Sequence, residues 1–158
     1  MLRQNLIEAN DSPCWQASFD GSALPNPGRI GIGAVLVAPD GQRFEHSQRT
    51  DYVGCNNEAE LLALCTILEL ALAHGAARIV VIGDSDIAVG YAKGIGASRV
   101  ARLQPLTLRA QTLLRRFAYC ELKWVPRHRN TDADRLARQA LNLPIEHTEV
   151  SRRHRKKR

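Results

Sequence analysis

The chain has 158 residues, a formal net charge of +6 and four cysteines that form no CxxC pair. The length suits one domain with a substantial hydrophobic core, and the cysteine spacing indicates neither a zinc site nor a disulfide framework. No segment reaches the roughly 18 consecutive apolar residues of a membrane span, and the N-terminus lacks the apolar run of a signal peptide. We therefore expect a soluble, cytoplasmic protein.

The positive charge is unevenly distributed along the chain. The last eight residues, SRRHRKKR, contain six Lys or Arg and no acid, and the rest of the chain has 16 basic and 16 acidic residues. Between Arg99 and Arg138, ten basic residues stand against three acids. Such a segment either forms a surface that binds a polyanion or supplies arginines that solvate a helix face.

The first third of the chain predicts an N-terminal arm over residues 1–13 followed by three strands. Polar and apolar residues alternate over 14–22, the segment 30–38 reads IGIGAVLVA, and 42–49 is more polar, as an edge strand would be. The connections are short and rich in Gly, Pro, Asn and Asp. We expect an antiparallel meander.

A helical period then begins. Apolar residues recur at steps of three and four over residues 57–74, which predicts an amphipathic helix. The following ARIVVIGDSD is continuously apolar at its start, as in a strand buried on both faces. The remaining segments predict a short helix at 86–93, a glycine-containing loop at 94–98, a helix starting near Pro105, a strand at 120–125 and a last helix at 130–141.

The predicted order βββαβααβα indicates an α/β fold. Three antiparallel strands followed by parallel strands give a mixed five-stranded sheet with helices on both faces. We expect the domain to span residues 14–143, with a basic, disordered tail at 144–158.

Four acids lie at junctions of these elements: Asp20, Glu60, Asp84 and Asp134. The carboxyl ends of parallel strands and the starts of the following helices collect at one edge of a sheet, so we expect these side chains to converge. Clustered carboxylates repel one another, and Mg²⁺ or Mn²⁺, which prefer oxygen ligands, would neutralise them.

Each acid also has an ordinary explanation. Asp20 can belong to a turn, Glu60 to a capping box with Asn57, Asp84 or Ser85 to a helix cap, and Asp134 to an ion pair with Arg138.

Four segments carry a resemblance to a known family. DGSALPNPGRIGIGAVL, NNEAE, VIGDSD and VPRHRNTDADRLA, in this order, resemble ribonuclease H type I over about residues 15–142. The resemblance implies a ribonuclease H-like fold and selects Glu60 over Glu58, Asp84 over Asp86, and Asp134 over Asp132 as catalytic and metal-binding acids.

The resemblance also implies an activity. Members hydrolyse the RNA strand of RNA/DNA hybrids with two Mg²⁺ or Mn²⁺ ions, giving 5′-phosphate and 3′-hydroxyl ends, without a small-molecule cofactor, and a monomer is expected. The residues implied to bind substrate are Gly21, Ser22, Asn26, Asn56, Asn57 and Arg127, and His128 is a candidate proton shuttle.

The chain departs from the family pattern at three places. Cys55 stands where a Thr usually precedes the paired asparagines, only Gly94–Ser98 replaces a basic protrusion, and His128 lies six residues before Asp134 rather than ten. Val125-Pro126-Arg127 resembles the compact branch that lacks the protrusion. The alternatives are a related metal nuclease acting on double-stranded RNA or another nucleic acid, and a catalytically silent binding module.

Overall fold

The computed structural model describes residues 12–95 and 100–143. Its elements are β1 (Cys14–Leu24), β2 (Gly28–Val37), β3 (Arg43–Gly54), α2 (Asn56–Ala73), β4 (Arg78–Gly83), α3 (Asp86–Ala92), η1 (Ala101–Leu103), α4 (Gln104–Leu114), β5 (Tyr119–Trp124), η2 (Arg127–Arg129) and α5 (Thr131–Ala140). The predicted tail, most of the predicted arm and most of the predicted glycine loop lie outside the described residues.

The five strands form one mixed sheet in the order β3-β2-β1-β4-β5. β1 pairs antiparallel with β2 and parallel with β4, and β4 pairs parallel with β5. The polar β3 is an edge strand, as its composition predicted. The predicted fold class, an α/β fold with three antiparallel strands and then parallel strands, is confirmed.

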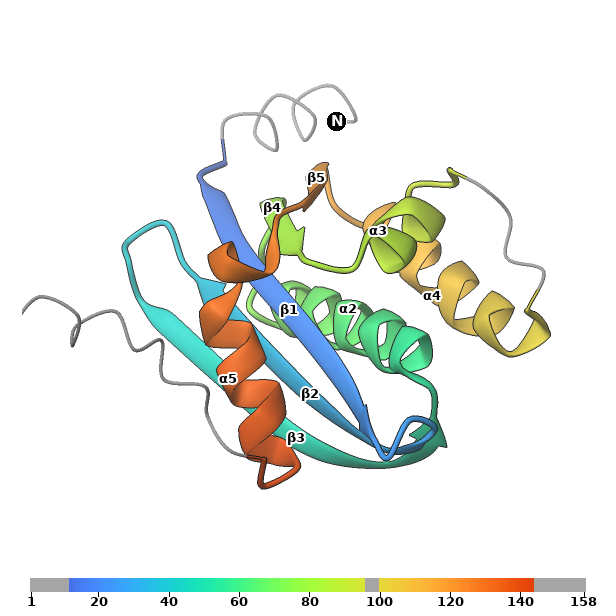
Figure 1. Cartoon of the computed structure of the whole chain (residues 1–158). Coiled ribbons are helices and arrows are strands. Elements are labelled where there is room, and N and C mark those ends of the chain that lie inside the picture. Colours follow the sequence, from blue (N-terminus) through green and yellow to red (C-terminus); the bar gives the residue numbers. More distant parts are fainter. Residues whose placement is uncertain (1–11, 96–99, 144–158) are drawn as a thin grey trace, which may run out of the picture.

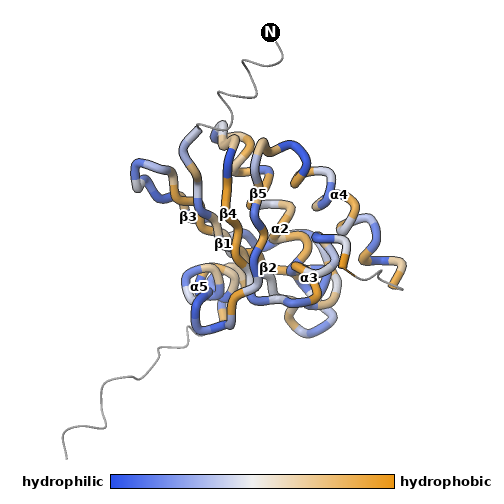
Figure 2. The backbone as a smooth tube through the Cα atoms, turned by 90° about the horizontal axis from the view of Figure 1, so that it is seen from above, coloured by the Kyte–Doolittle hydropathy of each residue, from blue (hydrophilic) through white to orange (hydrophobic). Residues whose placement is uncertain are grey.

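Helices cover both faces of this sheet, as predicted. α2 lies across one face with α3 and α4 beside it, and α5 lies on the other face (Figures 1 and 2). The core lies between the sheet and α2, where Phe19, Leu64 and Val81 are fully buried. Among the described helices, none combines the length and apolar character that crossing a membrane requires.

Three strand predictions need correction. β3 does not end near residue 49 but continues to Gly54. β1 does not end near residue 22 but continues to Leu24, because Ala23 and Leu24 still pair with Ile30 and Arg29 of β2 before the turn. β4 is buried on one face only. Ile79 and Val81 point into the core, whereas Ile82 is partly exposed because α5 packs over β1, β2 and β3 rather than over β4.

Candidate active site

The strand register brings two of the four acids together. Phe19 of β1 is paired with Gly83 of β4, and beyond this pair the two strands separate. Asp20 and Asp84 are the next residues on each strand and therefore emerge side by side. Asp20 was predicted at the end of a strand; it instead lies within β1, at the end of the parallel pairing with β4.

A glycine beside Asp20 admits α2. A Cβ atom on Gly21 would lie 2.1 Å from the carbonyl oxygen of Ala59 and 2.7 Å from the nitrogen of Glu60, so only glycine permits this approach. The helix thereby carries the Glu60 carboxylate to Asp20. Oxygen atoms of Asp20, Glu60 and Asp84 all lie within 4.8 Å of one another.

The capping-box explanation for Glu60 is wrong. The N-cap of α2 is Cys55, and its N–H donates to Oε1 of Glu58 at 3.3 Å. Because Glu58 performs the capping role and also pairs with Arg102 at 2.9 Å, the carboxylate of Glu60 is left to face the cluster.

A second glycine admits α5 from the opposite face. Gly33 is paired with Asp20 across the β1–β2 ladder, and a Cβ atom there would lie 2.1 Å from the carbonyl oxygen of Ala133. The close approach brings Asp134, in the first turn of α5, near Asp20. Two helices on different faces of the sheet thus supply acids to the same point.

Burial and mutual repulsion dominate the electrostatics of this cluster. The pKa of Asp20 is raised to about 7, first by burial and then by the charges of Asp84 and Asp134, while a hydrogen bond with Glu60 opposes the rise. The pKa of Glu60 lies well above its usual range, first through burial and then through the charge of Asp20. These acids resist ionisation unless positive charge is added.

Asp84 is better solvated and is fixed by its backbone. Burial raises its pKa, whereas a hydrogen bond with Asn130 and the charge of Arg127 oppose that rise. The indole Nε1 of Trp124 donates to the carbonyl oxygen of Asp84 at 3.0 Å, which ties the ends of β4 and β5 together. Ser85 caps α3 by accepting from the N–H of Ala88 at 3.1 Å, so the Asp84 carboxylate is not used as a cap.

Asp134 differs from the other acids because cations hold it. Nε of Arg138 lies 3.2 Å from Oδ1 and 3.1 Å from Oδ2, which confirms the predicted pair one turn apart. The guanidinium of Arg127 lies 3.7 Å from Oδ1. Asp134 does not belong to the group of three acids whose oxygens lie within 4.8 Å.

The cluster fits a divalent cation with oxygen preference. Oε2 of Glu60 is buried and has no hydrogen-bond partner, a costly condition for a carboxylate oxygen that a cation would relieve. The neighbouring donors are carboxylates without a thiolate or imidazole, which matches Mg²⁺ or Mn²⁺ rather than zinc.

The residues that resemblance implied for substrate binding have different surroundings. Gly21 is buried beneath α2. The side-chain oxygen of Asn26 accepts from the backbone N–H of Asn56 at 3.1 Å. The side-chain oxygen of Asn56 accepts from the backbone N–H of Ala23 at 2.9 Å. These bonds tie the β1–β2 turn to the start of α2. The amide NH₂ groups of both asparagines remain for a ligand. Half-buried Ser22 and Asn57 and exposed Arg127 and His128 complete the set.

Sequence reasoning missed Asn130. This residue is 2% exposed, and its Nδ2 donates to the carbonyl oxygen of Phe19 at 2.9 Å, next to Asp20. It also lies beside Asp84. Asn130 was treated only as the start of the last helix; a polar residue between a strand and a helix that carries an acid was the available signal.

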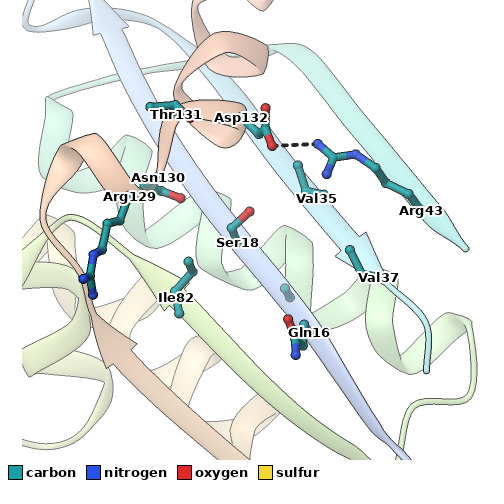
Figure 3. A pocket seen from close by; sticks show the side chains of 11 residues that line it. Gln16, Ser18, Val35, Val37, Arg43, Ile82, Arg129, Asn130, Thr131 and Asp132 are labelled. Atoms are coloured by element: carbon teal, nitrogen blue, oxygen red, sulfur yellow. Dashed lines mark ion pairs between the residues drawn. The ribbon is translucent and has the colours of Figure 1, made fainter. Parts of the chain in front are cut away.

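A pocket of about 260 Å³ lies on the α5 side of the sheet (Figure 3). Its floor is formed by alternate residues of β1 and β2, including Ser18 and Val35, and Asp132 pairs with Arg43 at 3.0 Å on its rim. The amide oxygen of Asn130 points toward Ser18 in Figure 3 and is buried without a hydrogen-bond partner. Asn130 lines this pocket, whereas none of Asp20, Glu60, Asp84 and Asp134 does.

Comparisons with known proteins identify the family. A family model described as reverse transcriptase-like matches residues 18–140. Over 126 residues the chain is 36% identical to ribonuclease HI of Halobacterium salinarum, covering 80% of this chain and 63% of that protein. The chain belongs to the ribonuclease H family. It is also 36% identical over 124 residues to a bifunctional protein, Rv2228c, of Mycobacterium tuberculosis, of which it spans about a third (34%).

Solved ribonuclease H structures have the same fold. The crystal structure of RNase H1 from Halobacterium salinarum has a TM-score of 0.77 at 35% identity, with 82% of this chain and 98% of that chain covered. LC11-RNase H1, solved in complex with an RNA/DNA hybrid, has a TM-score of 0.72 at 25% identity, with 81% and 96% covered. The ribonuclease H fold predicted from the four motifs is therefore confirmed.

Proposed function

We propose that this protein is a metal-dependent endonuclease that hydrolyses the RNA strand of RNA/DNA hybrids, leaving 5′-phosphate and 3′-hydroxyl ends. The observation that carries the proposal is the convergence of Asp20, Glu60 and Asp84, with one carboxylate oxygen buried and unpaired. Membership of the ribonuclease H family supports the reaction class, and the LC11-RNase H1 complex with a hybrid supports the substrate.

The acids have distinct proposed roles. Asp20 lies at the centre of the cluster, because its carboxylate interacts with Glu60, Asp84 and Asp134. Glu60 and Asp84 complete the ligand set around one Mg²⁺ or Mn²⁺ ion, and Asp134 serves a second. When bound, such a pair of ions activates an attacking water and stabilises the departing 3′ oxygen.

Recognition of the hybrid is assigned to the surface beside the cluster. RNA is distinguished from DNA by its 2′-hydroxyls, which a shallow minor groove presents. The amide NH₂ groups of Asn26 and Asn56 can donate to them, because the oxygens of these side chains are already bound to the backbone. The backbone of Gly21, with Ser22 and Asn57, lies between these amides and the acids, and Arg127 can contact a phosphate.

His128 is proposed as a proton shuttle. It lies in η2, exposed and three residues from the start of α5. Replacement by Ala would reduce kcat rather than raise KM if the imidazole transfers a proton.

The proposal is tested by incubating the protein with end-labelled RNA/DNA hybrid, double-stranded RNA and double-stranded DNA in Mg²⁺ or Mn²⁺. The expected result is cleavage of the RNA strand of the hybrid, abolished by chelation and by Asp20→Asn. Cleavage of double-stranded RNA in preference to the hybrid, or binding of hybrid without cleavage, would contradict the proposal.

A further inference from the structure

We propose that Arg127 is a releasable counter-ion of Asp134, which couples the binding of nucleic acid to the binding of a divalent cation. The proposal rests on the metal-dependent function above and concerns Asp134, which differs from Asp20, Glu60 and Asp84 in being paired with two arginines. Arg127 competes with a cation for Asp134 in the free protein and leaves Asp134 when a phosphate group offers a better partner.

The two arginines on Asp134 are not equivalent. Arg138 is 19% exposed in its side chain, lies one turn along α5 and contacts both carboxylate oxygens at 3.1 and 3.2 Å. Arg127 is 62% exposed, belongs to η2 and lies 3.7 Å from one oxygen, beyond hydrogen-bond length. Arg138 therefore positions the carboxylate, whereas Arg127 contributes charge through a weak, exposed contact.

This weak contact bears on metal binding because of where it lies. Asp84 also senses Arg127, whose charge opposes the rise in the Asp84 pKa. A guanidinium near two acids of the cluster repels a divalent cation and lowers its affinity. Asp134, which contacts Arg138 and Arg127, also stands outside the group of acids whose oxygens converge.

A nucleic acid supplies phosphate groups that would draw Arg127 away from Asp134. Guanidinium binds phosphate through two parallel, charge-assisted hydrogen bonds, which are stronger than a single contact at 3.7 Å. Because Arg127 is exposed, a phosphate at the edge of the cluster can reach it. Once Arg127 moves to the phosphate, Asp134 loses a positive neighbour and becomes a better metal ligand. Linkage requires the converse, so that metal also strengthens nucleic-acid binding.

The test measures Mn²⁺ binding from the electron paramagnetic resonance signal of free Mn²⁺, with and without a saturating RNA/DNA hybrid. The RNA strand carries 2′-O-methyl groups, which make it resistant to hydrolysis. They keep an acceptor oxygen for the amides of Asn26 and Asn56 and leave unchanged the phosphates that Arg127 would bind. In the wild type, we expect the hybrid to tighten Mn²⁺ binding by about tenfold, within the usual range of coupling between sites. In Arg127→Gln, binding without hybrid tightens by about threefold and the effect of the hybrid falls by the same factor.

Arg135→Gln is the matched control. It removes the same charge from the residue after Asp134, but Arg135 pairs with Glu45 at 3.0 Å on the side of β3. The quantity compared is the Mn²⁺ affinity with hybrid divided by the Mn²⁺ affinity without hybrid. A ratio that falls in Arg127→Gln and stays at the wild-type value in Arg135→Gln supports the proposal. An unchanged ratio in Arg127→Gln, or an equal fall in both variants, overturns it.

Cleavage of an unmodified hybrid, measured in parallel, separates this proposal from the proposed function. If the wild type shows the Arg127-dependent coupling but does not cleave the hybrid, the proposed function is wrong and the counter-ion proposal is supported. If the wild type cleaves the hybrid but Arg127→Gln leaves the coupling intact, the proposed function is supported and the counter-ion proposal is wrong.

Discussion

Glu60 and Asp134 reach the same point from opposite faces of the sheet, in very different electrostatic settings. Glu60 comes from the α2 face, where it is buried against Asp20 and has one unpaired oxygen. Asp134 comes from the α5 face, where Arg138 and Arg127 hold it. The carboxyl group from the α2 face therefore has no positive partner among the described residues until a metal ion binds, whereas the charge of Asp134 on the α5 face is balanced by arginines of the protein.

We expect the largest difference between the two faces in the catalytic activity of variants that lack one acid. We expect Glu60→Gln to lower kcat/KM for the hybrid by about a thousandfold, because loss of a metal ligand removes several kcal/mol of transition-state stabilisation. Asp134→Asn should cost less, about tenfold, because Asp134 stands outside the converging group. Equal losses, measured in initial-rate cleavage assays, would show that the two faces contribute alike.

The two glycines test how the helices deliver their acids. Gly21→Ala and Gly33→Ala each place a methyl group about 2.1 Å from a helix carbonyl oxygen, and we expect each to lower the free energy of unfolding by on the order of 3 kcal/mol. Urea denaturation measures this. Gly90→Ala in α3 is the control, since the nearest atom to its new methyl group would be the carbonyl oxygen of Ile95 at 3.7 Å; this change should stabilise slightly. Wild-type stability in Gly21→Ala would refute close packing of α2.

The raised pKa of Asp20 predicts how the stability of the protein depends on pH. Its pKa of about 7 in the folded protein exceeds the reference value of 3.8, so the folded state binds more protons than the unfolded state between these values. The metal-free protein should therefore lose stability as the pH rises from about 4 to about 7, by on the order of 3 kcal/mol from this group. The difference between wild type and Asp20→Asn in thermal melts isolates the effect; parallel profiles would contradict it.

Metal-free stability should change in opposite directions on the two faces. Glu60→Gln removes a carboxyl group whose ionised form is disfavoured by burial and by the charge of Asp20, so it should raise the melting temperature at a pH high enough to ionise Glu60 in the wild type. Asp134→Asn leaves Arg138 and Arg127 without their acid and should lower stability by about 1 kcal/mol, or roughly 3 °C for a domain of this size. Differential scanning calorimetry in EDTA measures both, and shifts of the same sign would contradict the comparison.

The sequence was sufficient to predict the sheet, the helices on both faces and the convergence of Asp20 and Asp84, because these follow from periodicity and from the geometry of parallel strands. The Asp134–Arg138 pair followed from helical spacing. The roles of single residues were less predictable. Glu58, not Glu60, caps α2 because the N-cap of the helix is Cys55 rather than Asn57.

Glycines and buried amides show where sequence patterns are ambiguous. Gly21 looked like part of a turn, but it is required by the contact with Ala59, a relation that only the folded chain creates. Asn130 reaches Phe19 across 111 residues, and no local pattern encodes such a contact. The predicted polyanion-binding surface stays a prediction, and two of its arginines, Arg102 and Arg109, pair with acids of α2.

The most direct test of the central claim, that separate acids form one site for divalent cations, is thermal melting with and without metal. Millimolar Mg²⁺ or Mn²⁺ should raise the melting temperature of the wild type by roughly 5 °C. Asp20→Asn should melt higher than the wild type in EDTA and lose most of the response to metal. If metal leaves the wild type unchanged and Asp20→Asn gains no stability in EDTA, the acids do not form such a site.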